Sequence, residues 1–136
     1  MPSCRDAALA YALRGWAVFP CKPHAKTPAT PHGLKDATTD PKKIEQFPDG
    51  NLAIRTGGGL VVLDIDVKKA DGEATLQGWE AEHEPLPRTY QVRTPSGGKH
   101  FYFTGSAPTK ASIGPGVDIR GDGGYVVAPP SVLPNG

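Results

Sequence analysis

The chain has 136 residues, a length typical of one domain, and its formal net charge is +1. A charge this close to zero excludes a general electrostatic attraction to nucleic acid, so any such binding needs a local groove. The chain also lacks an apolar run of membrane-spanning length and a basic-then-apolar signal pattern. We therefore expect a cytoplasmic protein without membrane contact, and Cys4 and Cys21, which lack CxxC spacing, are expected to be reduced.

The N-terminal third predicts two helices and one strand. The first helix begins after Ser3, which can cap it, and ends near Gly15. Its apolar face is expected to comprise Ala7, Leu9, Ala10 and Leu13. The segment "WAVFP" then predicts a short buried strand, and residues 21–35 predict a loop. A second helix is predicted to begin at Asp40, because Pro41 suits a first turn.

The remainder of the chain predicts mainly strands. "NLAIRT" and "GLVVLDID" are predicted strands on either side of a glycine turn, and "ADGEATLQGWEAEHE" is a predicted helix. "TYQVRT" and "HFYFT" flank "PSGGK", a strong hairpin signal, and "GVDIRG" and "GYVVAPP" are expected to pair around "GDGG". Since helices and strands are mixed without strict alternation, we expect an α+β fold with a largely antiparallel sheet and flanking helices.

Two carboxylates end the most apolar of these strands. Side chains alternate along a strand, so Asp64 and Asp66 are predicted to project from the same face. Two interpretations are open. Either the strand has ended and both carboxylates lie in water, or a cation offsets their repulsion. Hard divalent ions such as Mg²⁺ take oxygen ligands, often one or two carboxylates together with substrate phosphates.

Two other predicted strands carry polar residues on one face. His100 lies on the face of "KHFYFT" opposite two phenylalanines, which are expected to face the core, and Asp118 and Arg120 share one face of "GVDIRG". If these strands are neighbours, the carboxylates, the histidine and the arginine would share a surface suited to a metal-bound triphosphate. Taken singly, His100 can also be a structural histidine and Asp118 a turn cap.

The glycines of "SGGK" have two readings as well. The segment resembles a phosphate cradle but lacks the Walker spacing and the following helix, so we interpret it mainly as a hairpin turn. Gly97 and Gly98 would still let backbone amides approach a phosphate.

In order, "VVLDID", "SGGKHFYF" and "GVDIRGDGGYVVAPPS" resemble the bifunctional DNA primase/polymerase N-terminal domain, the prim-pol branch of the archaeo-eukaryotic primase superfamily. The resemblance runs from about residue 7 to about residue 131. It implies a catalytic sheet like that of the RNA-recognition motif beside a small N-terminal α/β module. Because further strand and helix usually follow in the family, residues 1–136 are expected to form a single prim-pol catalytic domain that lacks its C-terminal end.

The resemblance implies a metal-dependent nucleotidyl transferase that uses two divalent ions, Mg²⁺ or Mn²⁺. In the family, the paired acids of the first motif and the acid of the third bind the ions, and these positions match Asp64, Asp66 and Asp118. The histidine of the second motif binds the incoming triphosphate and matches His100. Gly98 stands where that motif often has serine. These three acids and the histidine are therefore the predicted catalytic residues.

Further nucleotide-binding candidates are basic side chains. Arg120 is expected to contact a phosphate or the template, and Lys26 and Arg55 are additional candidates that could equally be solvated surface charges. The expected partners are a dNTP or NTP, a primer on a single-stranded DNA template, and a replicative helicase. Two alternatives stay open: a nucleotide- or single-strand-binding module without catalysis, and a metal-dependent nuclease.

Overall fold

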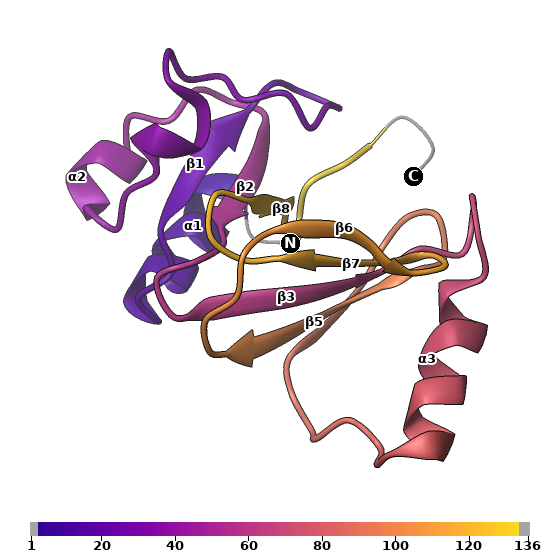
Figure 1. Ribbon diagram of the computed structural model, residues 1–136. Helices are drawn as coiled ribbons and strands as arrows, with labels where there is room; N and C mark the ends of the chain where they lie inside the picture. The colour runs from indigo at the N-terminus through magenta and orange to yellow at the C-terminus, as the bar shows by residue number, and fades with distance from the viewer. Residues whose placement is uncertain (1–2, 134–136) are drawn as a thin grey trace. The chain divides into compact units, whose positions relative to one another are not determined.

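The computed structural model describes residues 3–133, which have a mixed α+β fold with three α-helices and two antiparallel sheets. The predicted fold class is therefore confirmed. The chain divides into unit 1, residues 1–56 and 123–136, and unit 2, residues 57–122 (Figure 1). The expected N-terminal module corresponds to unit 1, but it also contains a strand from the C-terminal part of the chain. Across the described residues, no helix is both long and apolar enough to cross a bilayer.

Unit 1 contains a three-stranded antiparallel sheet in the order β1-β2-β8. Its elements are α1 (Cys4–Leu13), β1 (Val18–Cys21), a 3-10 helix (Gly33–Asp36), α2 (Pro41–Ile44), β2 (Asn51–Arg55) and β8 (Tyr125–Val127). All four residues of β1 are buried, as "WAVFP" predicts. The predicted loop over residues 21–35 is irregular up to the 3-10 helix. The second helix begins as predicted, because the Asp40 side chain accepts a hydrogen bond from the Lys42 amide.

The first helix has the predicted ends but a different buried face. The Ser3 side chain caps its first turn, and Gly15 follows its last turn with φ +86°. The buried residues are Ala8 and Tyr11, whereas Leu13 is 89% exposed, so the predicted face was wrong. Apolar residues lie on most sides of this helix, and Tyr11 decides its orientation by donating to the Pro129 carbonyl at 2.9 Å.

Unit 2 contains a five-stranded antiparallel sheet in the order β4-β5-β3-β7-β6. Its elements are β3 (Leu60–Ile65), α3 (Gly72–Glu82), β4 (Gln91–Arg93), β5 (Lys99–Thr104), β6 (Lys110–Gly114) and β7 (Val117–Arg120). The predicted hairpin of β4 and β5 is confirmed, and the Thr94 amide donates to the Gly98 carbonyl across its turn. The edge strand β6 was not predicted.

The second predicted strand pair was wrong. β7 pairs with β3 and β6, whereas β8 pairs with β2 in unit 1. The "GDGG" segment does not form a hairpin turn, because the Asp122 amide donates to the Ala107 carbonyl and the Gly121 amide to Thr109. The chain then leaves unit 2 at Gly123, whose φ of +79° favours glycine.

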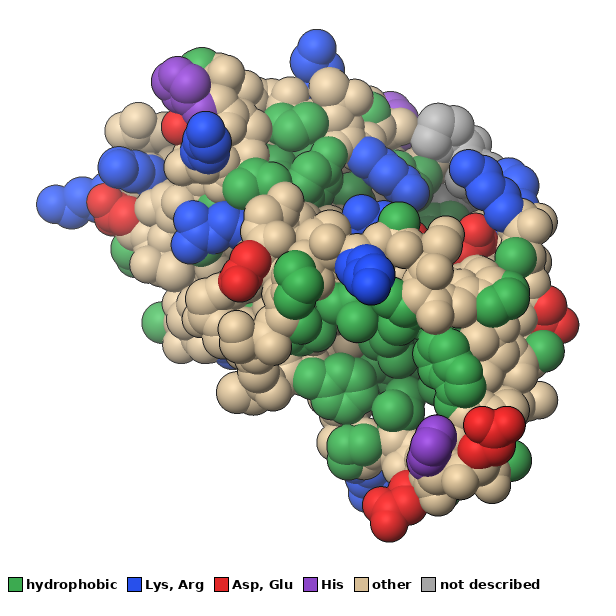
Figure 2. All heavy atoms as spheres, viewed as in Figure 1, with side chains coloured by type: hydrophobic (Ala, Val, Ile, Leu, Met, Phe, Trp, Pro, Cys, Tyr) green, Lys and Arg blue, Asp and Glu red, His purple; other side chains and the backbone are tan. Residues whose placement is uncertain are grey.

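One face of the five-stranded sheet forms the core of unit 2. α3 packs against β3 and β7 on this face. The buried cluster and the apolar residues around it are Ile65, Leu76, Phe101, Val117, Leu63, Trp79, Leu86, Phe103 and Ile113. Phe101 and Phe103 thus face the core as predicted. Hydrophobic side chains are also exposed on the surface near α3 (Figure 2). Because side chains alternate along strands, Asp64 of β3, His100 of β5 and Asp118 and Arg120 of β7 project from the opposite face.

Candidate active site

The central strand of unit 2 places Asp64 directly opposite two polar residues. Asp64 is the register partner of His100 on β5 and of Asp118 on β7. Directly opposite residues of an antiparallel pair project from the same face. Arg120 joins them on that face, since it lies opposite Val62, two residues along β3 from Asp64. The strands are therefore neighbours, as the predicted shared surface requires.

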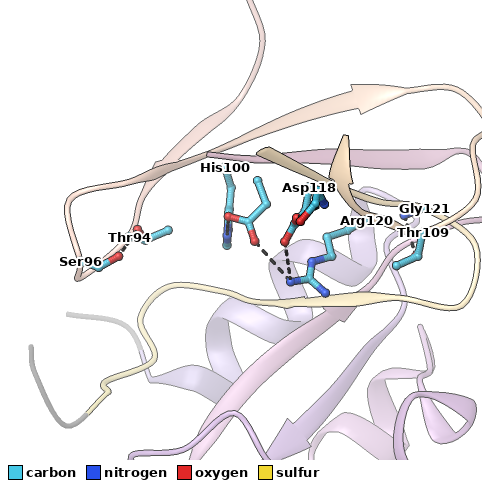
Figure 3. A network of polar contacts seen from close by, with 9 residues as sticks. Thr94, Ser96, His100, Thr109, Asp118, Arg120 and Gly121 are labelled. Atoms are coloured by element: carbon cyan, nitrogen blue, oxygen red, sulfur yellow. Dashed lines mark hydrogen bonds and ion pairs between the residues drawn. The ribbon is translucent and has the colours of Figure 1, made fainter. Parts of the chain in front are cut away.

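All four carboxylate oxygens of Asp64 and Asp118 have a partner. Figure 3 shows Asp118, Arg120 and His100 close together on this face, with Arg120 joined to carboxylate oxygens. Asp64 Oδ1 lies 3.4 Å from His100 Nε2, and Asp64 Oδ2 lies 3.5 Å from Arg120 Nη2. The same Arg120 nitrogen lies 3.6 Å from Asp118 Oδ2. The Ser112 amide donates to Asp118 Oδ1 at 2.7 Å. Within the described part of the chain, Arg120 is thus the one partner that both carboxylates share.

Ser112 is a positioning residue that the sequence analysis missed. The β6–β7 pairing shifts register between Lys110 and Gly114, and Ser112 has a φ of +53°, rare for a residue other than glycine. This bulge directs the Ser112 amide at Asp118. The sequence alone does not indicate this contact, because it depends on the pairing of β6 with β7, and β6 was not a predicted strand.

Asp66 does not take part in the ion pairs of this cluster. β3 ends at Ile65, and Asp66 Oδ1 accepts a hydrogen bond from the Lys68 amide at 3.0 Å. Among residues 3–133, the ion pairs of His100 and Arg120 are with Asp64 and Asp118 and not with Asp66. Asp66 therefore follows the end of the strand, as the first of the two interpretations expects. Asp64 lies within the strand and belongs to the polar cluster on the sheet.

The surroundings of Asp64 favour its ionised form. Burial raises the pKa of this carboxyl, since its side chain is only 21% exposed, but the hydrogen bond and charge of His100 and the charge of Arg120 outweigh burial. The pKa of Asp64 is therefore held below its ordinary value. At neutral pH the Asp64 carboxyl is an anion whose two oxygens can act as metal ligands.

The glycine hairpin has a clear structural role. A Cβ at Gly98 would collide with the Ile65 carbonyl oxygen, so this position needs glycine for close backbone packing. Gly97 has a φ of +91°, and its amide donates to the Thr94 carbonyl within the turn. The exposed hydroxyls of Thr94 and Ser96 lie 3.4 Å apart beside it (Figure 3). Contact of Gly97 or Gly98 with a phosphate stays a prediction.

The two further basic candidates belong to unit 1. Arg55 is the last residue of β2 and is half-buried. Lys26 is exposed on the loop after β1, where its carbonyl accepts a hydrogen bond from the Tyr125 hydroxyl at 3.1 Å. Their part in nucleotide binding stays a prediction.

The donor set fits a divalent ion that is completed by other ligands. Within the described residues, no group of three His, Cys, Asp or Glu side chains is arranged to hold a metal. Asp64 and Asp118 nevertheless present hard oxygen donors to a common positive charge. Mg²⁺ and Mn²⁺ suit such donors, and Mg²⁺ commonly binds one or two carboxylates plus substrate phosphates and water. Substrate and solvent oxygens would supply the remaining ligands.

The sheet and its polar cluster define a class of α+β protein in which acidic and basic side chains converge on one sheet face. The sequence model of Prim-Pol, the bifunctional DNA primase/polymerase N-terminal domain, matches residues 8–136. Because this match covers nearly the whole chain, the chain belongs to the prim-pol family, which confirms the resemblance. Members of this family act on nucleotides and DNA, and its polymerases typically use divalent metal ions. A comparison with curated proteins gives no match.

Proposed function

We propose that the chain is a metal-dependent nucleotidyl transferase that makes or extends a primer on a single-stranded DNA template. The observation that carries this proposal is the register of the central strand, which sets Asp64 opposite both His100 and Asp118, with Arg120 joining the two carboxylates. In combination with the family match, this arrangement supports a site for a triphosphate and its counter-ions.

The proposed reaction joins the primer 3′ oxygen to the α-phosphorus of the incoming nucleotide. The bond between the α-phosphorus and the bridging oxygen breaks, pyrophosphate leaves and the hydroxyl proton is released. When bound, divalent ions supply Lewis acidity at the hydroxyl and neutralise triphosphate charge. Asp64 and Asp118 would hold such ions, with Asp66 as a further ligand. The low pKa of Asp64 means that no proton has to be lost from this carboxyl at neutral pH.

We assign His100 to triphosphate binding. Its side chain is only 11% exposed, and its contact with Asp64 uses Nε2. Nδ1 is buried, and no residue in the described part of the chain hydrogen-bonds to it. The imidazole thus faces Asp64 through Nε2, and a phosphate contact at Nδ1 requires the side chains that cover this nitrogen to move. Its placement supports a contribution through positioning and charge stabilisation.

The finer features of the proposal come from the family resemblance. They are two Mg²⁺ or Mn²⁺ ions, a dNTP or NTP as substrate and a replicative helicase as partner. A cytoplasmic location is proposed separately, from the hydropathy pattern of the sequence. Arg120, Lys26, Arg55, Gly97 and Gly98 complete the proposed nucleotide-binding set. Each of these residues is a separate target for substitution.

Nucleotide incorporation on primed and unprimed single-stranded DNA, with Mg²⁺ or Mn²⁺, tests the proposal. We expect wild type to extend the primer and Asp64→Ala to lose this activity, because the substitution removes a ligand carboxylate. Glu84→Ala is the matched control, since Glu84 is an exposed carboxylate outside the site. Products on the unprimed template would add primase activity. A folded Asp64→Ala protein that still incorporates nucleotide at the wild-type rate would contradict the proposal.

A second candidate is a binding module for nucleotide or single-stranded DNA without catalysis. The ion pairs of Arg120 with both Asp64 and Asp118 favour it, because they neutralise the carboxylates without a metal ion. Such a module would shift a labelled single strand, incorporate nothing and be indifferent to Asp64→Ala. Shortening of the strand without added nucleotide would instead indicate a nuclease.

A further inference from the structure

Arg120 occupies the place where the two carboxylates of the sheet would bind a cation. Its Nη2 atom contacts Asp64 Oδ2 and Asp118 Oδ2 at 3.5 and 3.6 Å. The remaining oxygens are held by His100 and by the Ser112 amide. His100 is largely buried and Ser112 contributes backbone, whereas the Arg120 side chain is 37% exposed. Arg120 is therefore the partner that can leave at least cost.

We infer that Arg120 is the resident counter-ion of the Asp64–Asp118 pair, and that a divalent ion binds there by displacing it. The second part rests on the proposed function. Displacement frees the guanidinium, whose planar set of donors suits phosphate oxygens. Ion binding and triphosphate binding are then coupled through one side chain. Arg120 thus has two successive roles. It neutralises Asp64 and Asp118 before the ion binds, and it contacts phosphate after the ion has displaced it.

The strength of the contacts permits this exchange. Ion pairs that are partly exposed and 3.5 Å or longer change an equilibrium constant by about fivefold at most. Competition from Arg120 would thus weaken ion binding modestly without preventing it. Without any counter-ion, the two carboxylates would repel each other across neighbouring strands. Arg120 therefore stabilises the sheet before ions bind.

A double-mutant cycle in EDTA tests the counter-ion role without metal or activity. We expect Arg120→Gln to lower the thermal unfolding midpoint by about 2–4 °C when Asp118 is present. In the Asp118→Asn background, where the repulsion is gone, the fall should be no more than half as large. An equal fall in both backgrounds would show that Arg120 acts through packing and would overturn the inference.

A Mn²⁺ titration by calorimetry, without nucleotide, tests the displacement. We expect Arg120→Gln to bind Mn²⁺ about fivefold more tightly than wild type does, because competition is removed. Lys99→Gln is the matched control: it removes a positive charge next to His100 that pairs with Glu73 and not with the site carboxylates. Its affinity for Mn²⁺ should stay within about twofold of the wild-type value.

The outcomes separate this inference from the proposed function. Equal Mn²⁺ affinity of wild type and Arg120→Gln would overturn the displacement, while loss of incorporation in Asp64→Ala would leave the proposed function intact. Equal tightening by Lys99→Gln and Arg120→Gln would show a general charge effect and would also overturn it. Wild type that binds no Mn²⁺ would count against both, and the cycle in EDTA would still decide the counter-ion role.

Discussion

His100 Nε2 lies 3.4 Å from Asp64 Oδ1, across the β3–β5 pair where the two residues are directly opposite. This contact is the largest influence that lowers the pKa of Asp64, against burial, which raises it. We therefore predict that His100→Leu raises the pKa of Asp64. Carbon-detected NMR of the side-chain carboxyls over an acid titration would measure the change.

The pH dependence of the stability that Asp64 contributes follows from proton linkage. Because the pKa of Asp64 is lowered by folding, its stabilising contribution is present above the ordinary carboxyl pKa and is lost as the pH falls through the lower folded value. His100→Leu should remove this contribution. Asp36 serves as control, because its low pKa comes mainly from the His32 amide in unit 1. An unchanged Asp64 titration in a folded His100→Leu protein would contradict this assignment.

Cys21 gives a second prediction that depends on pH. Its side chain is fully buried, and burial raises the pKa of its thiol from 9.0 to about 11. In a Cys4→Ser background we expect Cys21 to resist a thiol reagent at pH 8 until the chain is unfolded. The contribution of the neutral thiol to stability should be complete below pH 9 and lost between pH 9 and about 11. Rapid labelling of the native protein would show that this strand is accessible.

Local patterns were sufficient to predict much of the sheet and site. Alternation along "LVVLDID", "KHFYFT" and "GVDIRG" correctly separates core-facing residues from Asp64, His100, Asp118 and Arg120. The β4–β5 hairpin was also predictable, because its turn chemistry is local. The sequence of a strand determines which of its faces points to the core. It does not determine which other strands pair with it.

The features that were wrong or missed depend on contacts between distant segments. β8 resembles the return strand of a hairpin, yet it pairs with β2, about 70 residues earlier in the chain. The buried face of α1 is set by the bond from Tyr11 to Pro129, 118 residues away. Ser112 lies in a bulge that exists only because β6 pairs with β7. No local pattern carries these long-range pairings.

Two glycines of unit 2 predict opposite effects of the same substitution. A Cβ at Gly98 would collide with the Ile65 carbonyl, so Gly98→Ala should destabilise the fold by about 1–3 kcal/mol. A Cβ at Gly78, in α3, meets nothing within 4 Å, and Gly78→Ala should stabilise by about 0.5–1 kcal/mol. Chemical denaturation would measure both changes. Native stability of Gly98→Ala together with weaker nucleotide binding would instead favour a direct phosphate contact at this turn.

Asp66→Asn separates catalysis from stability at the acid that lies outside the cluster. Asparagine keeps the Oδ1 acceptor for the Lys68 amide, so the thermal midpoint should fall by less than about 2 °C. Incorporation should be lost, because a neutral amide oxygen is a much poorer ligand for a divalent ion than a carboxylate. Primer extension and thermal unfolding of the same preparation would measure both effects.

Asp71→Asn is the matched control for this change. Asp71 Oδ1 caps α3 by accepting a hydrogen bond from the Ala74 amide, and asparagine caps a helix about as well as aspartate does. The control therefore makes the same chemical change nearby and should retain full activity. A collapse of the midpoint in Asp66→Asn would mean that this residue stabilises the fold. Full activity in a stable Asp66→Asn protein would mean that Asp64 and Asp118 suffice without it.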